Sequence, residues 1–186
     1  MKGSIVKNEL HDQIKELEQE YDIDFSSTQK VLLSIRGTIT GILDVIYGNV
    51  SVFTLKQSSQ NVDSEKAELL NVDKDEEIHV REVLIHGKGR PLIYNLSHIP
   101  LERCRKEARD DIIKGELTIS KILEKHKIES RRKVKKVYIE KPNATLKELF
   151  HTQEDFISRE YVIFEHGEII LWIKESFPIS YFTDKL

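Results

Sequence analysis

The chain has 186 residues, of which 33% are charged and 39% hydrophobic, and its formal net charge is −3. This composition is typical of a globular protein and excludes a disordered, collagen-like or membrane-embedded chain. The single cysteine, Cys104, excludes an intrachain disulfide framework and a zinc site built on cysteines. The negative charge argues against a general nucleic-acid-binding surface. The first residues lack the apolar stretch of a signal peptide, so we expect a cytoplasmic protein.

Apolar spacing and turn residues predict helices and strands along the whole chain. Leu10, Ile14 and Leu17 recur at helical spacing, and Glu77 to His86 is the clearest strand pattern. In chain order, the expected elements are helices at 4–21, 29–35 and 39–47, a strand at 49–57, a short helix at 65–70, strands at 77–86 and 91–97, helices at 101–114 and 119–127, a strand at 134–140, a short helix at 145–150, and strands at 160–164 and 169–173.

Two helix starts have recognisable caps. The hydroxyl-rich stretch 26–28 precedes the helix at 29–35. Thr38 is the expected capping hydroxyl of the helix at 39–47, and Gly48 is expected to end it.

The strands are joined by hairpins and short helices rather than by regular βαβ units. The turns at 87–90 and 165–168 each connect two strands as a β-hairpin. We therefore predict an α+β fold, in which helices pack against one face of an antiparallel sheet. The whole chain, 1–186, is expected to be a single domain with an N-terminal helical segment at 1–28.

Most signatures of catalysis are absent from the sequence. The seven histidines include no pair at i, i+4, so we expect no metal site. No Gly-x-Ser-x-Gly motif occurs, and the Gly87 turn lacks the lysine and helix start of a P-loop. Cys104 is interpreted as a packing residue.

Arg81 is the first candidate site residue. Strand alternation places it on one face with His79, Val83 and Ile85. An arginine among apolar neighbours must be paired or must bind an anion. Two alternatives follow: a salt bridge with an acidic residue of an adjacent strand, or a contact with an anionic ligand.

Glu175 is the second candidate, because alternation places it with Leu171 and Ile173. It is expected to be either the partner of an arginine or a site residue. One arginine and one glutamate that face a shared apolar pocket would suit a small carboxylate ligand that also has a hydroxyl group.

The one basic run covers residues 131–136. It is either the solvated face of a strand or an anion-binding wall, in which Arg132, Val134 and Lys136 share one face. A nucleic-acid-binding module built on this run is disfavoured, because no aromatic residue interleaves the basic ones.

Several short segments, taken in this order, resemble the chorismate pyruvate-lyase family, including its archaeal and actinobacterial branch. The similarity is colinear from about residue 29 to 182. The segments are Gly37–Thr40, Asn49–Val52, Val80–Leu84, Gly87–Ile99, Thr118–Leu123 and Lys174–Pro178. The Arg-Glu-Val strand with its glycine turn also occurs in related ligand-sensing domains of bacterial transcription regulators. The glutamate before the final Phe-Pro pair favours the lyase.

The resemblance implies an antiparallel sheet of about six strands and the cleavage of chorismate to 4-hydroxybenzoate and pyruvate without a cofactor. By position, Arg81 matches the arginine that binds the ring carboxylate, and Ile119 supplies a backbone N–H to the same group. Glu175 matches the glutamate at the ring hydroxyl, and Arg132 lies near a basic strand position of the family. The expected partner is a small molecule, chorismate, rather than nucleic acid or membrane. The longer connection at 141–158 departs from the family and could reshape the lid of the pocket.

Chorismate has two carboxylates, so its pocket needs two cationic or N–H anchors. Arg132 or Lys136 would hold the second, pyruvyl carboxylate. The alternative function is a binding domain of the same fold that does no chemistry.

Overall fold

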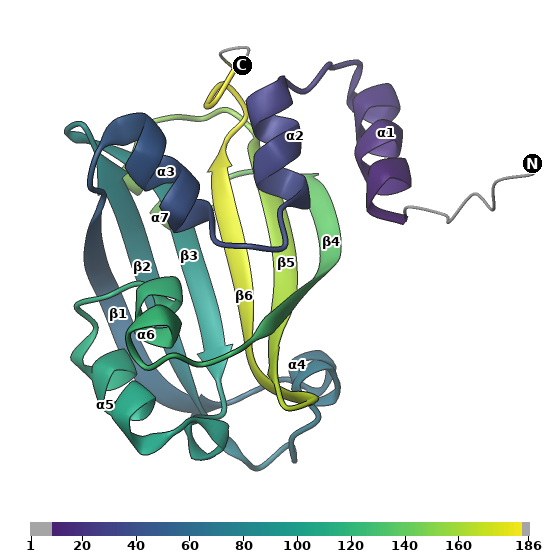
Figure 1. Cartoon of the computed structure of the whole chain (residues 1–186). Coiled ribbons are helices and arrows are strands. Elements are labelled where there is room, and N and C mark those ends of the chain that lie inside the picture. Colours follow the sequence, from purple (N-terminus) through teal and green to yellow (C-terminus); the bar gives the residue numbers. More distant parts are fainter. Residues whose placement is uncertain (1–8, 184–186) are drawn as a thin grey trace, which may run out of the picture.

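A six-stranded antiparallel sheet forms the centre of the computed structural model, which describes residues 9–183 (Figure 1). The spatial order of the strands is β1-β2-β3-β6-β5-β4. The strands are β1 (Ser51–Asn61), β2 (Glu77–Gly87), β3 (Arg90–Ile99), β4 (Arg131–Glu140), β5 (Phe156–Glu165) and β6 (Glu168–Pro178). The predicted α+β fold with a six-stranded antiparallel sheet is confirmed.

Seven α-helices accompany the sheet within the described residues. They are α1 (Glu9–Tyr21), α2 (Ser27–Ser34), α3 (Ile39–Tyr47), α4 (Ser64–Leu70), α5 (Lys106–Lys114), α6 (Ile119–Lys125) and α7 (Ala144–Phe150). The start of the helix predicted at 4–21 lies outside the described residues. The helix predicted at 101–114 is divided into a 3₁₀ turn, η1 (Leu101–Arg103), and α5, because Cys104 has an extended backbone. Across residues 9–183, no helix combines the length and the apolarity that a membrane crossing needs.

Both predicted hairpins are present, and each has a two-residue loop. Gly87 pairs with Arg90 across one turn, and Glu165 pairs with Glu168 across the other. Both central residues of each loop have positive φ, between 49° and 88°. Such turns match the right-handed twist of the strands that they join.

Helices cover both faces of the sheet, whereas the sequence predicted cover on one face. We call the face that carries Arg81 and Glu175 the inner face, and the opposite one the outer face. Helices α1, α2, α3, α5 and α6 pack on the inner face, and α4 and α7 pack on the outer face. The outer face needs this cover because its side chains, including Leu84 and Trp172, are also apolar.

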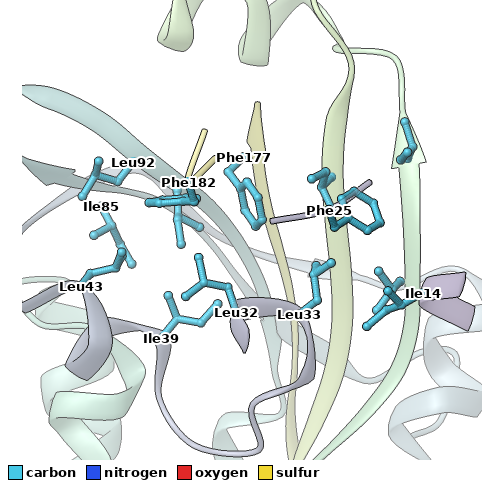
Figure 2. Close-up of a cluster of buried hydrophobic side chains, with 14 of the residues drawn as sticks. Ile14, Phe25, Leu32, Leu33, Ile39, Leu43, Ile85, Leu92, Phe177 and Phe182 are labelled. Atoms are coloured by element: carbon cyan, nitrogen blue, oxygen red, sulfur yellow. The ribbon is translucent and has the colours of Figure 1, made fainter. Parts of the chain in front are cut away.

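The largest part of the core lies between α1–α3 and one end of the inner face (Figure 2). Leu32, Leu33 and Leu43 are fully buried there against Ile85 and Phe177 of the sheet. Burying such side chains stabilises the fold by roughly 1.5–3 kcal/mol each. This packing fixes α2 and α3 beside the strand that carries Glu175.

The two predicted caps differ in the structure. Ser26 forms a complete capping box with Gln29 at the start of α2. Thr38 stands at the N-cap position of α3, but its side chain makes no capping hydrogen bond, so that part of the prediction is wrong. Gly48 ends α3 with φ 76°, as its position predicts.

Candidate active site

Arg81 projects from the middle of β2 into the inner face and is 1% exposed. Its Nη2 donates hydrogen bonds to the backbone oxygens of Gly115, at 3.0 Å, and Leu117, at 2.8 Å. A third contact joins Nη2 to the Thr54 hydroxyl at 3.3 Å. Gly115 has φ 75°, and a Cβ at this position would lie 2.8 Å from Gln57 Nε2. The glycine therefore lets the α5–α6 connection approach the guanidinium closely.

The guanidinium of Arg81 has no carboxylate partner within 4.0 Å among residues 9–183. Its buried Nε also lacks an acceptor there. Burial without a counter-charge lowers the pKa of Arg81 to about 10. The structure therefore does not show the salt bridge that was one alternative for this residue, and the site can accept an anion.

Glu175 lies on the inner face of β6 and is 6% exposed. Arg159 of β5 donates from Nε to its Oε2 at 2.6 Å, and the Tyr161 hydroxyl donates to its Oε1 at 3.0 Å. Arg159 also donates from Nη1 to the backbone oxygens of Leu32 and Ile35 at the end of α2. Burial, and then the negative charge of Glu175, raise the pKa of the Tyr161 phenol, so this hydroxyl stays a donor.

Arg159 and Tyr161 were not singled out from the sequence. The strand was predicted to begin at residue 160, whereas β5 begins at Phe156. Alternation backwards from Tyr161 would have placed Arg159 on the same face. Its pairing with Glu175 depends on the register of the predicted hairpin. Counting back from the turn at 165–168 would pair residue 159 with residue 174, but the bulge between Ile163 and Phe164 shifts the partner to Glu175.

Arg81 and Glu175 line one cavity, which we call the inner cavity. Its other lining residues are Thr40, Val83, Asn95, Ser97, Thr118, Ile119, Ser120, Tyr161 and Ile173. Most of these are polar, in contrast to the apolar pocket predicted, because the start of α6 contributes Thr118 and Ser120. The free volume is about 20 Å³, which is enough for about one water molecule.

Ile119 lines this cavity, and Arg132 contacts Ser120, another of its lining residues. Ile119 is the first residue of α6 and lines the wall, while the preceding Thr118 caps the helix by accepting from Lys121 N–H. Arg132 of β4 donates from Nη2 to the Ser120 hydroxyl at 3.2 Å. It therefore reaches the edge of the cavity from the edge strand of the sheet.

Lys136 does not share a face with Arg132 and Val134, so that prediction is wrong. A β-bulge at Lys135 shifts the register: Val134 pairs with Tyr161, but Lys136 pairs with Glu160. The extra residue turns Lys136 to the outer face, where its Nζ lies 4.8 Å from the centre of the Tyr138 ring.

The connection at 141–158 forms α7, which packs on the outer face through Leu146 and Phe150. It therefore does not form a lid over the inner cavity. Cys104 is buried, and burial raises the pKa of its thiol to about 11. Residues 9–183 contain no cluster of three or more His, Cys, Asp or Glu that could hold a metal ion.

Comparison with known proteins gives both sequence and structural matches. The family model of Rv2949c-like chorismate pyruvate-lyases matches residues 33–184. A protein of Methanocaldococcus jannaschii named "Putative lyase MJ0807" is 28% identical over 158 residues, which are 81% of this chain and 78% of that protein.

Two solved structures with a similar fold come from transcription regulators. The effector domain of PhnF from Mycobacterium smegmatis has a TM-score of 0.64 at 13% identity, covering 76% of this chain and 88% of that one. A GntR-family transcriptional regulator from Bacillus cereus has a TM-score of 0.60 at 15% identity, covering 74% and 96%. At these identities the likeness establishes the fold alone.

Proposed function

Because the chain belongs to the Rv2949c-like chorismate pyruvate-lyase family, we propose that it cleaves chorismate to 4-hydroxybenzoate and pyruvate in the inner cavity. One observation carries the proposal. The buried guanidinium of Arg81 has no carboxylate partner among residues 9–183, and it shares its cavity with Glu175. A ligand with a carboxylate at one end and a hydroxyl at the other complements this pair.

The ring carboxylate binds at Arg81. The Nε of this residue is buried without an acceptor in the described structure, so a carboxylate oxygen there would satisfy it. The backbone N–H of Ile119, on the cavity wall, is the second proposed donor to the same group. Charge-assisted contacts of this kind are stronger than neutral hydrogen bonds and fix the plane of the ring.

The ring hydroxyl binds at Glu175, across the cavity from Arg81. Arg159 and Tyr161 hold the carboxylate of Glu175 in one orientation, so it accepts a further hydrogen bond from one fixed direction. Cleavage breaks the ring C3–O bond and removes the C4 hydrogen as a proton. The ring becomes aromatic, and the released enolpyruvate takes up a proton to become pyruvate. Glu175, at the C4 hydroxyl, is placed to orient the carbon that loses its hydrogen.

The pyruvyl carboxylate is assigned to Arg132, at the edge of the cavity beside Ser120. A cation here also stabilises the charge that develops on the departing oxygen. Aromatisation supplies the driving force, so the reaction as proposed needs no cofactor.

Binding requires the cavity to expand, because pockets for small molecules measure about 300–1,000 Å³ and the inner cavity measures about 20 Å³. The α5–α6 connection is the element that Arg81 holds over the site, through Gly115 and Leu117. A substrate carboxylate would compete with these carbonyl groups for the guanidinium. We therefore assign the expansion of the cavity to a movement of this connection.

The test is direct. Purified protein is incubated with chorismate in the presence of a chelator, pyruvate is followed with lactate dehydrogenase and NADH, and 4-hydroxybenzoate is quantified by chromatography. Equal amounts of both products, above a protein-free control, are expected. A folded protein that releases neither product would overturn the proposal.

The second candidate is a domain that binds an aromatic carboxylate without chemistry. One observation favours it: transcription regulators, among them the effector domain of PhnF, share the fold. In that case, calorimetry would detect binding of 4-hydroxybenzoate, while chorismate would remain intact.

A further inference from the structure

A basic groove runs along the edge strand β4, beside the start of α1. It has a volume of about 670 Å³. Five cationic residues line it: Arg36, Arg131, Arg132, Lys133 and Lys135. Glu9 is the one acidic residue among those that line it.

The cations of the basic groove are not neutralised within the described structure. Among residues 9–183, the nearest carboxylate oxygen to each of the five lies beyond 4.0 Å, so none takes part in an ion pair. The Nε of Arg132 is buried and has no acceptor there. A chain with a net charge of −3 thus concentrates unpaired positive charge in one concave place. Such an arrangement focuses an attractive potential on anions.

The basic groove adjoins the inner cavity through two residues of β4. Arg132 lines the groove and also donates to Ser120, which lines the cavity. Val134 lines the groove and pairs in register with Tyr161, which lines the cavity. Each of these two β4 residues therefore lines the groove and neighbours a residue of the cavity wall.

We propose that the basic groove is the entrance of the inner cavity, which collects the dianionic substrate and through which the pyruvate anion leaves. This inference rests on the proposed function, and it assigns a role to Arg36, Arg131, Lys133 and Lys135, which the reaction itself does not use.

Electrostatic collection has a kinetic signature. It raises the rate of association and the kcat/KM of a charged substrate, and salt suppresses it. It leaves kcat unchanged, because the bound substrate and its transition state have the same total charge. The effect also scales with the charge of the ligand, so a dianion is affected more than a monoanion.

The experiment compares two double variants of equal charge change. Lys133→Gln/Lys135→Gln neutralises two exposed lysines of the groove. Lys56→Gln/Lys147→Gln neutralises two exposed lysines on β1 and α7, away from it. Turnover of chorismate is measured from about 10 to 500 mM salt, and association of 4-hydroxybenzoate is measured by stopped-flow absorbance.

We expect the groove variant to lose about tenfold in kcat/KM for chorismate at low salt, with kcat unchanged. The association rate of the monoanion 4-hydroxybenzoate should fall by about threefold, the square root of that factor. Both differences should vanish at high salt, and the control variant should match the wild type.

Failure of the proposed entrance and failure of the proposed function give different results. Wild-type turnover with equal kcat/KM in both variants would overturn the entrance and leave the proposed function intact. A fall of the same size in the control variant would also overturn it, because the effect would then come from total charge. A wild type that neither cleaves chorismate nor binds 4-hydroxybenzoate would overturn the proposed function and the entrance together.

Discussion

Arg159 and Glu175 stand directly opposite each other on β5 and β6 and form a buried ion pair, with 2.6 Å between Nε and Oε2. Arg159 is 1% exposed and also holds the end of α2 through the carbonyl groups of Leu32 and Ile35. The Arg159 side chain thus orients the Glu175 carboxylate and holds the end of α2 in place.

Removal of Arg159 should therefore destabilise the fold strongly. Arg159→Met leaves Glu175 buried without its counter-charge, and breaking a buried pair from one side costs about 3–5 kcal/mol. The free energy of unfolding, measured by urea denaturation, should fall by that amount. The Glu175→Gln/Arg159→Met double variant should recover part of the loss, since no unpaired charge remains. Strictly additive losses would show that the two charges are not coupled.

Arg81 should determine affinity for carboxylates. Arg81→Ala is expected to weaken binding of 4-hydroxybenzoate by about 2–5 kcal/mol in calorimetry, because a buried charged contact is lost. Arg81→Lys should restore only part of it, because lysine lacks the planar fork. Arg103→Ala is the matched control, since Arg103 also donates to backbone carbonyls, those of Leu70 and Ile169, away from the site. An affinity unchanged by Arg81→Ala would remove this residue from the site.

The inward orientation of Arg81 and Glu175 could be predicted because strand alternation is a local property. The position of Lys136 could not be predicted, because the bulge at Lys135 has no signal in a run of basic residues. The partnership of Arg159 with Glu175 was also inaccessible. The hairpin that joins their strands was predicted, but a bulge between Ile163 and Phe164 shifts its register by one residue and brings Glu175 opposite Arg159.

Helix α3 likewise has one feature that the sequence predicts correctly and one that it does not. Its bounds, residues 39–47, agree with the prediction because apolar spacing and Gly48 fix them locally. The hydroxyl of Thr38 nevertheless makes no cap, since a capping bond depends on a side-chain rotamer that competes with packing.

The two N-caps should therefore respond differently to substitution. Ser26→Ala removes the acceptor of the Gln29 N–H and the donor to the Phe182 carbonyl, so we expect a loss of about 1–2 kcal/mol in unfolding free energy. Thr38→Ala removes no capping bond, so its effect should stay within about 0.5 kcal/mol. Equal losses in parallel urea titrations of the two variants would contradict this distinction.

His98 should make stability sensitive to acid. Burial, and then the charge of Lys66, lower the pKa of His98 to about 4 in the folded protein, from about 6.5 in the unfolded chain. Between these values the unfolded chain binds a proton that the folded protein does not, so stability falls as the pH drops from 6.5 to 4. We expect a loss of about 2 kcal/mol, discounted for partial exposure of the ring.

The measurement uses Trp172, the one tryptophan of the chain, which lies against the His98 ring at 5.0 Å between centroids. Urea unfolding followed by its fluorescence should show the acid-side slope in the wild type. His98→Phe, which keeps a ring beside Trp172, should flatten that slope. Substitution of the exposed His11 by Gln should not change it. A slope that persists in His98→Phe would assign the acid sensitivity to other groups.

Glu175→Gln separates charge from shape at the proposed hydroxyl site. Glutamine keeps the size of the side chain and an oxygen that can accept from Arg159 or Tyr161, so the variant should fold and bind 4-hydroxybenzoate within about threefold of the wild type. The variant lacks the negative charge of the carboxylate that faces the C4 hydroxyl. It also lacks the basicity of that carboxylate. That loss acts on the transition state rather than on the bound product, so kcat should fall by about 10²–10⁴-fold.

Glu140→Gln is the matched control, because Glu140 is an outer-face carboxylate that accepts from Ser158 and Lys174. Steady-state rates of pyruvate release and calorimetric affinities from the same preparations decide the matter. Wild-type turnover in Glu175→Gln would mean that the residue only positions the hydroxyl and that its charge plays no part in the reaction.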